Sequence, residues 1–168
     1  YLYQMLYLGY EMGNDAGDAC SFTMGDIQFN ENDITSGGRG LDLYELYYLG
    51  YDMYGESSFQ MGDIQANGNE ITSDSDGLYV YYFGLFGYFM YGDSTFLMGS
   101  VQFNDNVIVA TDYGVYLEYP ISTIGDTMCG NSSARMGSFE VNGNTIDSGS
   151  DGIYVAYLEY IGGSMHDG

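Results

Sequence analysis

Residues 24–36 read MGDIQFNENDITS, and residues 61–73 read MGDIQANGNEITS, 37 positions further along the chain. Two more divergent copies follow, MGSVQFNDNVIVA at 98–110 and MGSFEVNGNTIDS at 136–148. The steps between the four copies are 37, 37 and 38 residues. Self-similarity at a fixed period is the signature of repeat architectures, so this repeat decides the fold.

Aligning the copies on their methionine places apolar residues in columns with the same steps. The first members of these columns are Phe22, Met24, Ile27, Phe29, Ile34, Leu41 and Leu43. Within a copy the apolar residues alternate with polar ones, as in Ile27–Gln28–Phe29, which is the period of a β-strand. No stretch sustains the spacing of an amphipathic helix. The pattern therefore predicts short strands of four to seven residues.

Short strands on a fixed period predict an all-β protein, a parallel β-solenoid in which each coil stacks on the previous one. The two halves of a unit do not resemble each other, so we expect one wide coil per repeat rather than two narrow ones. The whole chain then forms one open-ended domain of about four and a half coils, each 37–38 residues long. Its parts are a partial unit, 1–21, and repeats 22–58, 59–95, 96–133 and 134–168.

Asparagine, glycine and proline mark the turns. One asparagine column is Asn30, Asn67, Asn104 and Asn142, and a second is Asn32, Asn69, Asn106 and Asn144. Stacked amides can hydrogen-bond along such a column, and asparagine tolerates left-handed turn geometry. The extra residue in the 38-residue step lies beside Pro120, which predicts a bulge or bend there.

The composition excludes several functions. The 24 acidic residues face only two arginines and no lysine, and the net charge of −22 predicts no binding to nucleic acid or to anionic membrane surfaces. No apolar run reaches the roughly 18–20 residues of a membrane span, so we expect no membrane insertion. His166 is the only histidine, so the sequence argues against a Ser–His–Asp catalytic triad and against a metal site built from several histidines. We therefore predict a protein that is not an enzyme, with no catalytic residues and no bound cofactor.

Tyrosine is unusually frequent, with 20 residues, and several tyrosines share columns. The two columns beside the inward Leu and Val positions are Tyr79, Tyr116 and Tyr154, and Tyr82, Tyr119 and Tyr157. We expect these rings to face outward or into a neighbouring sheet. Aromatic columns make large packing surfaces, which favours lateral contact between copies over ligand binding.

Acidic residues gather in one turn of the repeat. Residues 37–43, GGRGLDL, match a calcium-binding nonapeptide pattern once, and the equivalent turns do not keep it. A looser calcium hypothesis rests on carboxylates that would repel if stacked. Its candidate ligands are Asp74, Asp76, Asp112 and Asp151. The alternative interpretation is a set of solvated turn residues.

Covalent modification has three candidate residues. Cys20 and Cys129 are three coils apart, about 14 Å along the stack, which is too far for a bridge within the chain. A disulfide to a neighbouring chain and two free thiols remain as alternatives. Asn131 opens the glycosylation sequon Asn131–Ser132–Ser133.

The stretches SDSDGLYVYY, 73–82, and SGSDGIYVAYLEY, 148–160, follow NGNEI and NGNTI. They resemble the tandem parallel β-helix repeats of surface-layer and sheath proteins of archaea, methanogens especially. The resemblance covers essentially the whole chain. It rests on the general residue pattern of the repeats rather than on an invariant motif. It implies an extracellular, self-assembling structural role in a cell envelope, tube or filament.

The ends of the chain agree with that role. The sequence begins inside a half-unit and stops at Gly168 without a polar cap, and exposed strand edges template further pairing. Because it starts at Tyr1, we expect a processed or trimmed chain. The expected partners are further copies or closely related repeat proteins. The alternatives are a carbohydrate-active or carbohydrate-binding β-helix module, and a fragment of a surface adhesin.

Overall fold

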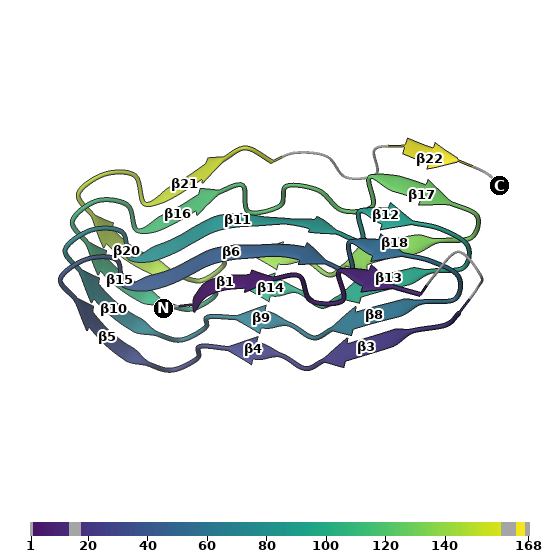
Figure 1. The fold of residues 1–168 in the computed structure, drawn as a ribbon. Helices are drawn as coiled ribbons and strands as arrows, with labels where there is room; N and C mark the ends of the chain where they lie inside the picture. The colour runs from purple at the N-terminus through teal and green to yellow at the C-terminus, as the bar shows by residue number, and fades with distance from the viewer. Residues whose placement is uncertain (1, 14–17, 159–163, 167–168) are drawn as a thin grey trace.

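The computed structural model describes residues 2–13, 18–158 and 164–166 of the chain. All regular structure in these residues is β-strand, arranged in five parallel sheets, and none of them forms a helix long and apolar enough to cross a membrane. The chain runs along sheets A and B on one broad side of the molecule and returns through sheets C, D and E on the other (Figure 1). Stacked coils therefore form a solenoid, as the repeat predicts.

Each sheet takes one strand from every coil. Sheet A contains β1 (Leu2–Leu6), β6 (Leu41–Leu49), β11 (Leu78–Phe86), β16 (Val115–Glu118) and β21 (Ile153–Ala156). Sheet B contains β2 (Glu11–Met12), β7 (Asp52–Met53), β12 (Phe89–Met90), β17 (Thr127–Cys129) and β22 (Ser164–His166). Sheet C contains β3 (Ser21–Met24), β8 (Ser58–Met61), β13 (Thr95–Met98) and β18 (Ser133–Met136). Sheet D contains β4 (Ile27–Gln28), β9 (Ile64–Gln65), β14 (Val101–Gln102) and β19 (Phe139–Glu140), and sheet E contains β5 (Asp33–Ser36), β10 (Glu70–Ser73), β15 (Val107–Ala110) and β20 (Thr145–Ser148).

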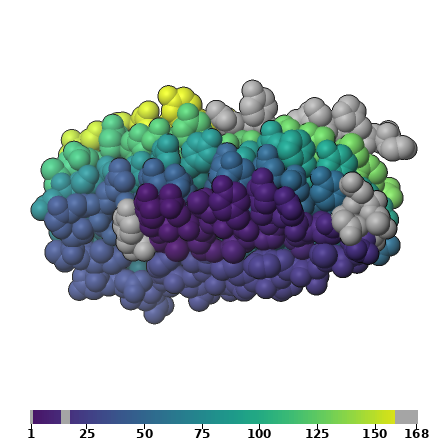
Figure 2. All heavy atoms as spheres, viewed as in Figure 1, coloured from purple at the N-terminus to yellow at the C-terminus, as the bar shows by residue number. Residues whose placement is uncertain are grey.

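The register of the strands reproduces the repeat. Ile27 of β4 pairs with Ile64 of β9, and Ile34 of β5 pairs with Ile71 of β10. Each pairing joins residues 37 positions apart, so one repeat makes one wide coil, as predicted. Because neighbouring coils are only about 4.8 Å apart, the stack is wider than it is tall (Figure 2).

The core lies between the two broad sides. Phe59 of β8 and Phe96 of β13 stack with ring centroids 5.1 Å apart, and Phe86 of β11 reaches across the core to within 6.0 Å of Phe96. All three rings are buried. The predicted apolar columns therefore form the interior, and the middle coils bury them completely.

The long strands of sheet A depart from the predicted alternation. Leu43, Leu46 and Leu49 all point into the core, at intervals of three residues rather than two. The cause is the left-handed backbone of Glu45 and Tyr48, whose φ angles are 57° and 59°. Each left-handed residue turns the chain so that the following side chain faces inward again. The expectation of a strict two-residue period is wrong for this sheet.

The bulge predicted at the proline is confirmed. Strand β16 ends at Glu118, whereas β11 below it continues to Phe86. Pairing resumes at Ile124, which bridges to Phe86 at a step of 38 residues. The additional residue is accommodated around Pro120, since the amide of Phe83 donates to the Tyr119 carbonyl and the Ser122 amide donates back to Phe83.

The turns before β6, β11 and β16 require glycine for lack of space. A Cβ on Gly77 would lie 2.2 Å from Cγ2 of Ile108 and 2.6 Å from the carbonyl oxygen of Gly114. Gly40 and Gly114 face the same obstruction from the next coil. Close coil-to-coil approach, rather than a left-handed backbone, explains this glycine column.

Candidate functional site

Tyrosines occupy one broad side of the molecule. Every tyrosine in the described residues lies in the half of its coil that contains the strands of sheets A and B. They are Tyr3, Tyr7, Tyr10, Tyr44, Tyr47, Tyr48, Tyr51, Tyr54, Tyr79, Tyr81, Tyr82, Tyr88, Tyr91, Tyr113, Tyr116, Tyr119, Tyr154 and Tyr157. We call this side the tyrosine face. The strands of sheets C, D and E contain no tyrosine, and we call that side the amide face.

The first predicted tyrosine column is continuous. The ring centroids of Tyr79 and Tyr116 are 5.2 Å apart, and those of Tyr116 and Tyr154 are 5.0 Å apart. Tyr79 is buried, however, because the guanidinium of Arg39 lies 3.4 Å from its ring centroid. The ring of Tyr79 is therefore covered and not open to solvent.

The second predicted column is more open. Tyr119 stacks on Tyr157 at 4.6 Å, and Tyr82 meets Tyr119 at 5.1 Å with its ring tilted by 45°. Tyr157 is 58% exposed, so the upper end of this column is available for contact. Tyr82, Tyr119 and Tyr157 all have left-handed backbones and belong to the column of bends that begins at Gln4 and continues through Glu45.

The structure contains two further columns of stacked tyrosines that the sequence analysis did not predict. Tyr10, Tyr51 and Tyr88 stack at 5.1 and 5.0 Å with nearly parallel rings. Tyr3, Tyr44 and Tyr81 form another column, at 5.0 and 4.8 Å. Their 37-residue steps were visible in the sequence, but the partial front unit is shifted by an additional four residues, which hides Tyr3 and Tyr10.

Hydrogen bonds accepted by asparagine side chains link the coils of the amide face. In the predicted column, the side-chain oxygen of Asn30 accepts from the backbone amide of Asn67 at 2.9 Å. The side-chain oxygens of Asn67 and Asn104 accept in the same way from the coils above. The side chains of this column thus bond to backbone amides, not to one another.

The second asparagine column forms the amide-to-amide chain. The Asn69 side chain donates to Oδ1 of Asn106, and the Asn106 side chain donates to Oδ1 of Asn144, each at 2.9 Å. Asn69 and Asn106 are buried. Neither asparagine column is left-handed, because that conformation belongs to the residue between them, such as Glu31 or Asp105. We call these buried amides the inner asparagine ladder.

The candidate calcium ligands do not stack on one another. Arg39 occupies the position below Asp76, and Tyr113 separates Asp76 from Asp151. Asp74 and Asp112 belong to other columns, and Asp112 accepts from the hydroxyl of Ser75. In the described part of the chain no three His, Cys, Asp or Glu side chains are grouped to hold a metal ion.

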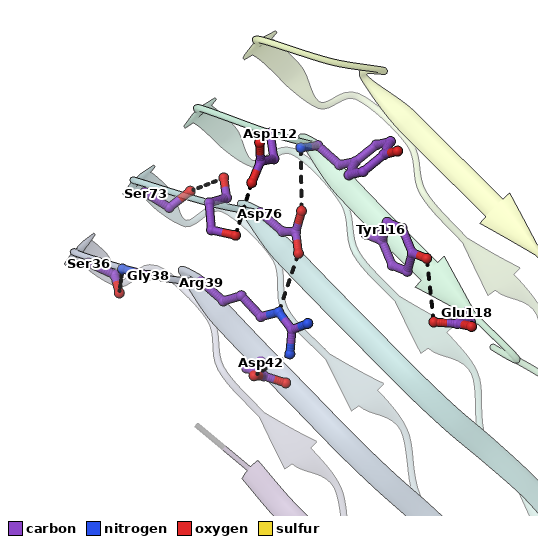
Figure 3. A network of polar contacts seen from close by, with 11 residues as sticks. Ser36, Gly38, Arg39, Asp42, Ser73, Asp76, Asp112, Tyr116 and Glu118 are labelled. Carbon is purple, nitrogen blue, oxygen red and sulfur yellow. Dashed lines mark hydrogen bonds and ion pairs between the residues drawn. The ribbon is translucent and has the colours of Figure 1, made fainter.

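The only salt bridges among the described residues join Arg39 to two carboxylates. Its Nε lies 3.3 Å from Asp76 and its Nη1 lies 3.3 Å from Asp42 (Figure 3). Asp42 is buried, and its Oδ1 has no hydrogen-bond partner within the described residues. Burial raises the pKa of Asp42, although the hydrogen bond from Arg39 opposes this effect. Burial likewise raises the pKa of Tyr79 to about 12.

The remaining candidate residues lie near the edges of the stack. Cys20 is exposed and Cys129 is half-buried, and both are free thiols. Cys20 occupies a turn column that otherwise contains Ser57, Ser94 and Ser132. Asn131 is exposed, and its side-chain amide donates to Asp93 in the coil below at 2.8 Å.

Comparison of the chain with protein-family models, with curated proteins and with solved structures gives no match.

Proposed function

We propose that this chain is a structural, non-catalytic subunit of an extracellular sheath, tube, filament or surface layer. Copies of the chain, or closely related repeat proteins, would join coil to coil through parallel β-ladders. The repeat texture that resembles archaeal surface proteins supports this setting. The proposal places the protein outside the cell.

The observation that carries the proposal is the exposure of core columns at the outer coils. Val115 is completely buried, whereas Ile153, the next residue of the same column, is 47% exposed. Burying such a side chain stabilises a protein by about 1.5–3 kcal/mol, so a further coil over Ile153 would be favourable. The same contrast separates Leu117 from Val155.

The backbone of the outer coils supports the same conclusion. Every sheet ends on an edge strand, for example β5 and β20 in sheet E. Edge strands offer unpaired amides and carbonyls that template further pairing. A coil from a second copy, placed in the same register, would continue both the strand ladder and the inner asparagine ladder.

Charge opposes this assembly. A net charge of −22 on each copy creates mutual repulsion that falls as salt shortens the Debye length, from about 30 Å at 0.01 M to about 3 Å at 1 M. The proposal therefore includes a dependence on salt. Polymers should form at high ionic strength and shorten or dissociate at low ionic strength.

The test uses two substitutions at equally exposed residues. Ile153→Lys places a charge on the outer coil, whereas Val109→Lys places one on the side of sheet E, where Val109 is 46% exposed. Electron microscopy at 1 M salt should show ordered fibres or tubes for the parent chain and for V109K, but dispersed particles for I153K. At 0.01 M salt, the polymers of the parent chain and of V109K should be shorter or absent. Circular dichroism should show the same strand content in all three.

Two results would overturn the proposal. Dispersed monomers of the parent chain at every salt concentration would remove self-assembly altogether. Fibres of I153K as abundant as those of the parent would show that coil ends do not form the contact.

A further inference from the structure

A depression of about 320 Å³ opens on the tyrosine face. Its walls come from three successive coils, through strands β1, β6 and β11. The residues that line it are Leu6, Glu45, Tyr47, Tyr48, Tyr81 and Tyr82. This volume is at the lower end of the range for ligand pockets, about 300–1,000 Å³, and fits a small molecule.

The left-handed bends create this depression. Tyr48 and Tyr82 have φ angles of 59° and 60°, which makes neighbouring side chains diverge rather than alternate across the strand. The rings of Tyr47 and Tyr48 are 4.0 Å apart at 67°, and those of Tyr47 and Tyr82 are 4.9 Å apart at 66°. Elsewhere on the tyrosine face, Tyr51 and Tyr88 stack with an angle of only 3°. The steep angles leave a hollow in place of a flat stack.

A carboxylate stands beside these rings. Glu45 lines the depression, and its Oε2 accepts a hydrogen bond of 2.7 Å from the side-chain amide of Gln4. Aromatic faces carry negative charge density and attract cations within about 6 Å of the ring centroid. With a net charge of −22, the whole chain adds a field that concentrates cations at its surface.

We propose that this depression binds an organic ammonium cation, held by the rings of Tyr47, Tyr48 and Tyr82 and by the carboxylate of Glu45. Two other ligand classes fit less well. A calcium ion needs six to eight oxygen ligands, and the depression offers one carboxylate among aromatic walls. A sugar ring needs a flat aromatic platform, which rings inclined at 66–67° do not provide.

The test measures binding to the monomer at low salt, so it does not depend on the proposed assembly. Choline chloride is titrated against the chain by NMR, with 3,3-dimethylbutan-1-ol as a neutral probe of the same shape. Choline should bind in the millimolar range and the alcohol at least tenfold more weakly, because only choline carries the charge. Choline binding should weaken further at 1 M salt.

Matched variants locate the site. Glu45→Gln should weaken choline binding about tenfold, whereas Glu140→Gln, which removes the same charge from the amide face, should change it less than twofold. Tyr82→Leu should weaken binding about fivefold, and Tyr82→Phe should restore it because the ring is retained. A folded state is checked for each variant by circular dichroism.

A second titration tests whether the natural ligand is a free ammonium compound or a lysine side chain of a protein. N-acetyl-lysine amide, titrated in the same way, would bind as tightly as choline if the natural ligand is a lysine of a partner protein. Tighter binding of choline would indicate a methylated small molecule. Equal binding of choline and 3,3-dimethylbutan-1-ol would overturn the proposal. Equal losses of choline binding in E45Q and E140Q would also overturn it.

Discussion

Successive coils contact one another through hydrogen-bonded amides on the amide face and through stacked aromatic rings on the tyrosine face. On the amide face, the strands alternate regularly and buried side chains such as Asn106 hydrogen-bond to the coils above and below. On the tyrosine face, left-handed residues interrupt the strands and stacked rings cover the outside. The difference shows that hydrogen-bonded amides fix the register, while aromatic stacks tolerate bends and bulges. The insertion at Pro120 lies, accordingly, on the tyrosine side.

The largest expected effect is on the inner asparagine ladder. Asn106→Ala removes the acceptor of two Asn69 donors and the donors to Ala66 and Asn144. Leaving these buried groups unpaired should lower the free energy of unfolding by about 4 kcal/mol. Urea denaturation should show a loss of only about 1 kcal/mol for the control, Asn104→Ala, in the more exposed column. Equal losses would mean that burial does not distinguish the two ladders.

The next effect concerns the turn that joins the two faces. Arg39→Met leaves the buried carboxylate of Asp42 without its cation. Because Arg39 is itself exposed, the expected destabilisation is about 2–3 kcal/mol, below that of a fully buried pair. Thermal unfolding of Arg135→Met provides the control, since Arg135 lies exposed on the amide face and should contribute less than about 0.5 kcal/mol. A neutral R39M would show that Asp42 is protonated or solvated.

Alkaline pH should act on the tyrosine face alone. Burial raises the pKa of Tyr51 and of Tyr116 to about 12, above the ordinary value of 10.0. A phenol with a raised pKa stabilises the folded state fully below pH 10, and this contribution is lost as the pH rises toward 12. Absorbance at 295 nm should therefore show phenols that ionise near pH 12 in the folded chain and near pH 10 in urea. Ionisation of all tyrosines near pH 10 in the folded chain would contradict their burial.

The smallest effect should be a gain in stability on the amide face. Glu31 has a left-handed backbone, φ 58°, at a position where Gly68 and Gly143 stand in other coils. Glu31→Gly removes a conformational strain of about 1 kcal/mol, and the unfolded chain's additional freedom offsets part of it. A net gain of about 0.5 kcal/mol is expected from urea denaturation. Thr35→Gly, in the extended strand β5, should instead destabilise the chain.

Much of the fold was predictable because each apolar column repeats at a fixed step. Ile34, Ile71 and Ile108 stand in consecutive coils, and parallel pairing brings them together. The bends in sheet A were harder to predict, since they depend on the backbone of residues such as Glu45 and Tyr48, which rarely adopt φ above zero. The spacing Leu43–Leu46–Leu49 was the available signal. Arg39 differs from the other residues of its column, so its position over the ring of Tyr79 could not be predicted from the repeat.

The inner asparagine ladder gives each coil a top that differs from its bottom. Amide protons point from Asn69 toward Asn106 and from Asn106 toward Asn144, so every link runs in one direction through the stack. A polymer that continued this chain would be polar, with chemically distinct growing and trailing tips. Addition of subunits could then proceed at different rates at the two tips, and a molecule that recognised one of them would set the length without blocking the other.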